Sequence, residues 1–199
     1  MSNAIKQTLL TEVAKDIQMI QLEDKLTADF YHEACFDCKE ATFKVLCWVD
    51  ETYQPKHVLY PASGFDIVPK LAFGEDRVTH TSLEEKGPNG VLYFPRLGSG
   101  KKVIADNANL PFEKESFDII LLLDSPFPFV GKQREELLRV LAKGGVVILS
   151  RNLFEEDLTA DRLAHYKKRH DLKEIIIPSE LQASSLGHIE FFGLQKMYD

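Results

Sequence analysis

Residues 103–150 read VIADNANLPFEKESFDIILLLDSPFPFVGKQREELLRVLAKGGVVILS, and consecutive parts of this stretch point to one architecture. Val103–Ala105 is a short apolar run that predicts a buried strand ending at Asp106. Residues 117–123 form a longer apolar run without strict alternation, which is typical of a strand covered on both faces. The stretch therefore predicts two strands joined by a turn-rich loop.

A helix is predicted over residues 133–143, where leucine and valine side chains recur at helical spacing. Gly144 and Gly145 are expected to end this helix. Residues 146–149 then predict a further strand. A series of strand, helix and strand with short joints indicates a parallel sheet with right-handed crossovers.

The same stretch carries a series of short motifs in a fixed order, namely Asp106, Leu110-Pro111-Phe112, Ser116-Phe117-Asp118, Arg139-Val140-Leu141 and Gly144-Gly145. It thereby resembles the second half of class I S-adenosylmethionine-dependent methyltransferases. The resemblance implies a doubly wound, Rossmann-like α/β sheet over residues 55–199, mostly parallel with an antiparallel last strand. It also implies S-adenosylmethionine as the cofactor.

Residues 1–54 are expected to form an N-terminal helical cap. The first fifty residues lack Gly and Pro, and apolar side chains recur at helical intervals, as in the stripe Leu9, Val13, Ile17 and Ile20. Two or three helices are predicted. They could serve as a lid over the site or simply cover the core, and amphipathic stripes favour cover because such stripes mostly report packing.

The first strand is predicted over His57–Tyr60, and residues 61–66, PASGFD, follow it. In the family, an acidic residue and a G-x-G-x-G loop stand here. On that pattern Tyr60 replaces the acid, Ala62 the first glycine and Asp66 the third, and only Gly64 is kept. The resemblance implies that Tyr60 and this loop lie against the cofactor, whose methionine half would run along Ser63 and Gly64.

Two residues of this loop have alternative roles. Asp66 could place a carboxylate near the amino group of the cofactor, or could cap the following helix, for which aspartate is a preferred residue. The cap is favoured. Ser63 could donate a hydrogen bond to the ligand or merely complete the turn.

Acidic residues follow the next two strands. Residues 77–83 predict the second strand, and Glu84 and Glu85 stand about 20 residues after the loop, where such folds place the acid that receives the ribose hydroxyls. A solvated charged turn is an equal alternative for this pair. The resemblance further implies that Asp106 accepts from the adenine amine and that the backbone of Asn107 meets the ring.

Asp124 is the predicted catalytic residue on the acceptor side. Residues 124–129, DSPFPF, faintly resemble the Asp/Asn-Pro-Pro-Tyr/Phe motif of methyltransferases that act on planar amino nitrogens, although Ser125 replaces the first proline. The alternatives are a proline-rich turn with exposed aromatic rings or a contact with the N-terminal helices. Further on, the sequence predicts a helix over 158–173 and strands over 174–177 and 189–197.

The composition and charge of the chain limit which binding partners and which cellular location are expected. Hydrophobic content of 44% and charge of 28% are ordinary for a globular chain of 199 residues. A net charge of −7 argues against a polyanionic partner such as a nucleic acid. A small-molecule acceptor is therefore expected, and a nucleic-acid acceptor is not. The chain has no apolar run that could span a bilayer and no signal-peptide core, so a cytoplasmic location is expected.

Three cysteines make a disulfide framework improbable. His32, Cys35 and Cys38 have a spacing that suggests zinc, but no second ligand pair follows, and cysteine is commonly a small buried residue. No metal is expected.

Two functions from different classes stay open at this point. One is methyl transfer to an acceptor that the sequence does not name. The other is a non-catalytic protein that kept the fold but lost cofactor binding or turnover, for which Tyr60, Ala62 and Asp66 are the evidence.

Overall fold

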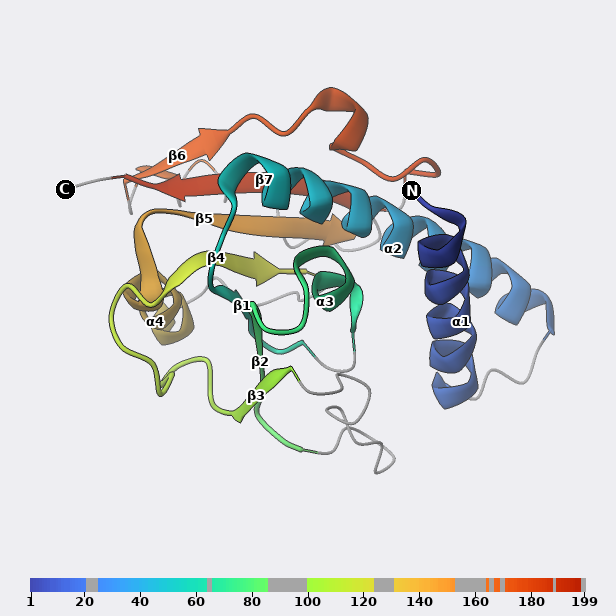
Figure 1. Ribbon diagram of the computed structural model, residues 1–199, viewed down its shortest axis with the longest axis horizontal. Helices are drawn as coiled ribbons and strands as arrows, with labels where there is room; N and C mark the ends of the chain where they lie inside the picture. Colours follow the sequence, from blue (N-terminus) through green and yellow to red (C-terminus); the bar gives the residue numbers. More distant parts are fainter. Residues whose placement is uncertain are drawn as a thin grey trace.

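The fold is built around one seven-stranded sheet with the strand order β3-β2-β1-β4-β5-β7-β6 (Figure 1). The computed structural model describes residues 1–20, 25–63, 66–85, 100–123, 131–152, 164, 167–168, 171–187 and 189–197. The strands are β1 (Val58–Tyr60), β2 (Val78–Ser82), β3 (Lys101–Ile104), β4 (Phe117–Leu122), β5 (Leu141–Asn152), β6 (Leu172–Ile175) and β7 (Ile189–Lys196). The helices are α1 (Asn3–Ile20), α2 (Lys25–Tyr53), α3 (Val68–Phe73), α4 (Gly131–Val140) and the 3-10 helix η3 (Ser179–Leu181).

Strands β1 to β5 pair in parallel, and β7 runs antiparallel to both β5 and β6. This is the predicted fold class. Strand β1 lies in the middle of the sheet, between β2 and β4, so the order of the strands reverses beside it. Open α/β sheets bind their ligands at such a switch point, outside the carboxyl ends of the strands.

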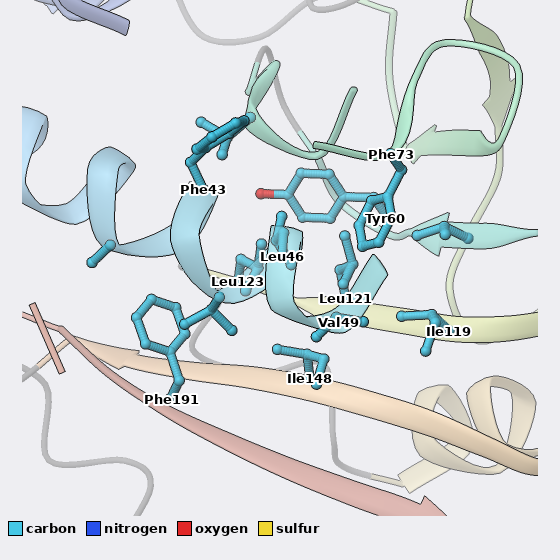
Figure 2. Close-up of a cluster of buried hydrophobic side chains, with 14 of the residues drawn as sticks. Phe43, Leu46, Val49, Tyr60, Phe73, Ile119, Leu121, Leu123, Ile148 and Phe191 are labelled. Atoms are coloured by element: carbon cyan, nitrogen blue, oxygen red, sulfur yellow. The ribbon is translucent and has the colours of Figure 1, made fainter. Parts of the chain in front are cut away.

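The two faces of the sheet have separate hydrophobic clusters. On one face, side chains of α1, α2 and α3 pack on alternate residues of β1, β4, β5 and β7, including Tyr60, Leu121 and Ile148 (Figure 2). On the other face, Leu137 and Val140 of α4 pack on the intervening residues of the same strands. The central strands are thus covered on both sides, which explains why they read as continuous apolar runs.

The N-terminal segment forms two helices that cover the core, as predicted. Leu9 and Val13 of α1 are fully buried, and so are Val45, Leu46 and Val49 of α2. The division of the chain into a cap of 54 residues and a sheet domain stays a prediction. No helix within the described part of the chain is long and apolar enough to cross a membrane.

The carboxyl end of α2 is fixed to the sheet by Arg77, which precedes β2. Its guanidinium donates to both carboxylate oxygens of Asp50, at 2.6 and 3.0 Å, and also to the backbone carbonyls of Phe73 and Pro55. A planar guanidinium that binds a carboxylate through two parallel bonds fixes orientation as well as distance. α2 therefore has a defined position over the sheet.

The prediction of a helix over 133–143 is wrong at its end. α4 stops at Val140, and β5 begins at Leu141, which pairs with Phe117 before the register shifts between Phe117 and Ile119. The two glycines lie inside this irregular start of β5. Gly144 has φ +72°, and a Cβ on Gly145 would come within 2.9 Å of the Asp118 carbonyl, so both positions require glycine.

The predicted boundary between a helix over 158–173 and a strand over 174–177 is also wrong. Leu172 and Lys173 already belong to β6, which ends at Ile175. Leu172 is buried in the cluster around α4, whereas Ile176 is 87% exposed. Most of residues 158–171 lie outside the described residues.

Candidate functional site

Strands β1, β2 and β3 end side by side at one edge of the sheet, hereafter the carboxyl edge. Tyr60, the last residue of β1, is in register with His80, and Ser82 at the end of β2 is in register with Ile104 at the end of β3. The segments that follow these strands carry most of the predicted site residues. Two of those residues, Gly64 and Asp124, lie outside the described part of the structure.

Hydrogen bonds join these three segments directly. The amide of Ser63 donates to the carbonyl of Thr81 at 3.1 Å, and the amide of Ala105 donates to the carbonyl of Ser82 at 2.9 Å. The hydroxyl of Thr81 donates to the side-chain oxygen of Asn107 at 3.3 Å. The structure therefore brings together the loop after β1 and the segment after β3, with the end of β2 between them.

Ala62 takes the left-handed backbone conformation, with φ +51°. This is the position at which the family pattern has its first glycine. A left-handed conformation costs an ordinary L-residue about 1–2 kcal/mol and glycine almost nothing. The turn therefore has the backbone conformation that glycine adopts most easily, with alanine at that position.

The carboxylate of Asp66 accepts three hydrogen bonds. The donors are the Tyr60 hydroxyl at 3.0 Å, the ammonium group of Lys39 at 3.3 Å and the backbone amide of Val68 at 3.1 Å. Val68 is the first residue of α3, so Asp66 satisfies an amide at the start of that helix. The N-cap position itself belongs to Ile67, so Asp66 acts from one residue before the cap and not as the predicted cap. The same carboxylate also connects β1 to α2 through Tyr60 and Lys39.

Two buried polar atoms at this edge have no hydrogen-bond partner among the described residues: Ser63 Oγ and His80 Nδ1. The two side chains are 4% and 1% exposed. Burial lowers the pKa of His80 from 6.5 to about 4, so its ring is neutral at pH 7. A buried polar atom without a partner costs about 1–3 kcal/mol, which favours a ligand or a bound water beside it.

The acidic residues of the edge face solvent. Asp106 is exposed, and its carboxylate accepts from the amide of Ala108 at 2.8 Å, which fixes the turn after β3. Glu84 and Glu85, just past the end of β2, are also exposed. Carboxylates at this rim can accept hydrogen bonds from a ribose diol or from an exocyclic amine.

Arg139 of α4 holds the loop that follows Asp106. Its guanidinium donates to the carbonyls of Leu110 and Phe112, at 3.1 and 2.9 Å, and forms an ion pair with Glu136 at 2.8 Å. Glu136 in turn accepts from the amide of Leu110. The hydrogen bond from Arg139 holds the pKa of Glu136 below its usual value. The spaced Leu-Pro-Phe and Arg-Val-Leu motifs of the sequence are thus in direct contact.

These residues fit an adenosine-type ligand with an amino-acid tail. Exposed acidic side chains at the carboxyl edge could accept from hydroxyls and an amine, and the Ser63 hydroxyl in the loop after β1 has no hydrogen-bond partner among the described residues. The described residues contain no group of three or more His, Cys, Asp or Glu side chains suited to hold a metal ion. Cys35, Cys38 and Cys47 are partly buried thiols.

Sequence reasoning missed Lys39 and His80. The Lys39–Asp66 ion pair joins residues 27 positions apart, one in a helix and one in a loop, and no local pattern signals such a contact. His80 could have been found, because the strand VTHTS is polar in composition yet lies in the middle of a sheet, where every residue is buried. A histidine in such a strand must lose its solvent contacts.

No family model matches the sequence, and neither does any curated protein. Solved structures do match. The 1,6-didemethyltoxoflavin-N1-methyltransferase of Burkholderia thailandensis, solved with S-adenosylhomocysteine bound, superposes with a TM-score of 0.58 at 12% identity, covering 100% of this chain and 92% of its own. The N-methyltransferase NodS of Bradyrhizobium japonicum superposes with a TM-score of 0.57 at 13% identity, covering 80% of this chain and 96% of its own. The (4+2)-cyclase SpnF superposes with a TM-score of 0.58 at 12% identity, covering 80% of this chain and 82% of its own.

The chain has the fold of class I S-adenosylmethionine-dependent methyltransferases. This conclusion agrees with the strand order and with the antiparallel β7. At 10–14% identity the likeness concerns the fold alone. Because a cyclase shares the fold with methyltransferases, the chemistry has to be argued from the residues of the site.

Proposed function

We propose that this protein binds S-adenosylmethionine at the carboxyl edge and transfers its methyl group to a small-molecule acceptor. The observation that carries the proposal is the convergence of three segments that are distant in sequence. Hydrogen bonds through Ser63, Thr81 and Ala105 join the loop after β1 and the Asp106–Asn107 segment after β3 to the end of β2. The acidic pair Glu84 and Glu85 follows directly after that strand, and open α/β sheets bind ligands outside the carboxyl ends of their strands.

Each segment would hold a different part of the cofactor. Asp106 would accept from the adenine amine, one of Glu84 and Glu85 would accept from the ribose hydroxyls, and Ser63 would donate to the methionine half. When bound, the cofactor supplies an electrophilic methyl group on a sulfonium centre. The protein would then contribute alignment of the acceptor and exclusion of water.

The acceptor is proposed to be a small molecule. With a net charge of −7 the chain does not favour a polyanionic substrate. One structural neighbour was solved with both 1,6-didemethyltoxoflavin and S-adenosylhomocysteine bound, which supports a small-molecule acceptor for this fold. Asp124 is proposed to orient the acceptor; Asp124→Ala should then lower turnover of an identified acceptor and leave cofactor affinity nearly unchanged.

The second candidate function is that of a protein which kept the fold without the reaction. Two observations favour it. The Asp66 carboxylate already forms an ion pair with Lys39, and Ala62 has a left-handed conformation at the position where the family pattern has a glycine. A protein of this kind that has lost cofactor binding would not be stabilised by the cofactor at any concentration.

Thermal melting with S-adenosylhomocysteine separates the two candidates. A ligand at 100 times its dissociation constant stabilises the folded state by about 2.7 kcal/mol, enough to raise the melting temperature by several degrees. Asp106→Ala should reduce that rise because a hydrogen bond to the adenine amine is lost, at a cost of about 1–3 kcal/mol. Glu113→Ala, an exposed acidic residue away from the carboxyl edge, is the matched control and should leave the rise intact. A melting temperature that does not change when S-adenosylhomocysteine is added would favour the second candidate.

A further inference from the structure

The ammonium group of Lys39 belongs to a cap helix, yet it lies at the carboxyl edge. Its Nζ is 3.3 Å from Asp66 Oδ1, and the two side chains are only 17% and 21% exposed. Lys39 precedes Phe43 by one helical turn, so the two residues share a face of α2. Figure 2 shows the Tyr60 ring packed in the same cluster, with its hydroxyl pointing toward the side of Phe43.

The surroundings of Asp66 have the chemistry of an ammonium-binding site. The carboxylate carries the negative charge, and the Tyr60 hydroxyl and the Val68 amide hold its two oxygens in place. The His80 ring lies beside Tyr60, with 5.8 Å between ring centroids, and contributes no competing positive charge because it is neutral at pH 7. A carboxylate fixed in this way can bind one primary amine well.

The bond that Lys39 makes to this site is a long one. Charge-assisted N–H···O bonds are usually about 2.7–2.9 Å, whereas this one is 3.3 Å. Lysine has a flexible four-carbon chain, so its ammonium group can move away without a change in the backbone of α2. A second ammonium group could therefore take its place.

We propose that Lys39 is the resident occupant of an ammonium-binding site at Asp66 and sets the affinity of the protein for ligands that carry a primary amine. An amine-bearing ligand exchanges with Lys39 for the carboxylate, and the amino-acid end of the cofactor is such a ligand. The inference rests on the proposed function, because that function brings the amino-acid end to the loop after β1. Its consequence is that Lys39 weakens the binding of amine-bearing ligands and leaves the adenosine half unaffected.

Calorimetric titration of four proteins with two ligands tests the inference. The proteins are the wild type, Lys39→Met, Lys39→Arg and Lys44→Met; Lys44 lies on the same helix and pairs with Glu40 instead of Asp66. The ligands are S-adenosylhomocysteine and 5′-methylthioadenosine, which lacks the amino-acid end. Lys39→Met should bind S-adenosylhomocysteine about tenfold more tightly than the wild type, since a competing charge near a partly buried carboxylate has been removed.

The other arms should show no change. Lys39→Met should bind 5′-methylthioadenosine as the wild type does, and Lys39→Arg and Lys44→Met should resemble the wild type with both ligands. Equal or weaker binding of S-adenosylhomocysteine by Lys39→Met would overturn the inference and leave the proposed function standing. If neither ligand binds any of the four proteins, both proposals are wrong. Should Lys39→Met melt far below the wild type, Lys39→Gln replaces it in the same comparison.

Discussion

His80 is a titratable residue buried within the sheet. It lies 1% exposed in β2, next to Tyr60, and its pKa is about 4 in the folded chain. An unfolded chain takes up this proton near pH 6.5. Acid therefore favours the unfolded state through this residue. The contribution of His80 to stability is fully present above pH 6.5 and is lost as the pH drops toward 4.

We expect this single residue to account for a loss of up to about 3 kcal/mol between pH 6.5 and 4. His80→Phe keeps an aromatic ring beside Tyr60 and should flatten the pH dependence of the unfolding free energy in the upper part of that range, above the range where carboxylates titrate. Urea unfolding at several pH values measures this pH dependence of the unfolding free energy. His57→Gln, at an exposed position, is the control. An unchanged slope in His80→Phe would contradict the assignment.

Ala62 provides a second test at the scale of one residue. Its φ of +51° is unfavourable for alanine, and its side chain is exposed, so glycine can replace it without a loss of packing. Ala62→Gly should raise the free energy of unfolding by up to about 1 kcal/mol, the strain relieved minus the entropy that glycine adds to the unfolded chain. Ala34→Gly, within α2, should change it by a similar amount in the opposite direction. Destabilisation by both variants would show that the turn is unstrained.

Among the elements, the central strands are the part of the fold that could be predicted from sequence. The prediction of a buried strand over Val103–Ala105 is wrong, because β3 (Lys101–Ile104) lies at the edge of the sheet and Ile104 is 52% exposed. Apolar runs placed β1, β4 and β7 to within one residue, because strands covered on both faces need continuous apolar sequence. The start of β5 could not be predicted, since the leucines of residues 137–141 have helical spacing while Leu141 is held by Phe117 across the sheet. β6 was misplaced because three isoleucines in a row suggest a strand, whereas pairing with β7 selects Leu172–Ile175.

The contact between α4 and the loop after β3 gives a prediction at this scale. Arg139→Met removes the hydrogen bonds to Leu110, Phe112 and Glu136, and should lower the free energy of unfolding by about 1–3 kcal/mol. It should also weaken cofactor binding, because the same loop carries Asp106. Chemical denaturation and calorimetry measure the two effects. Lys132→Met, exposed on the same helix, should alter neither, and normal binding by a destabilised Arg139→Met would show that the loop holds its shape without the arginine.

For the whole molecule, the important arrangement is a sheet whose carboxyl edge is approached by helix α2 (Figure 1). The sequence predicted that the acidic pair and Asp106 follow neighbouring parallel strands, and the ends of β2 and β3 do lie in register. The roles of these residues in binding stay predictions. It did not predict the contacts of Lys39, Tyr60 and Asp66, because these depend on how α2 lies over β1. A helix that packs on the sheet through its apolar stripe brings its polar residues to positions that no sequence spacing defines.

The central claim is that the cofactor binds at the carboxyl edge, and a titration of the backbone amide NMR signals with S-adenosylhomocysteine tests it most directly. The account predicts saturable shifts for the amides of Ser63, Ala105 and Asn107. The amides of Lys56, His57 and Val146, at the opposite end of the strands, should stay unchanged. An absence of shifts at millimolar ligand, or shifts confined to the opposite end, would contradict the claim.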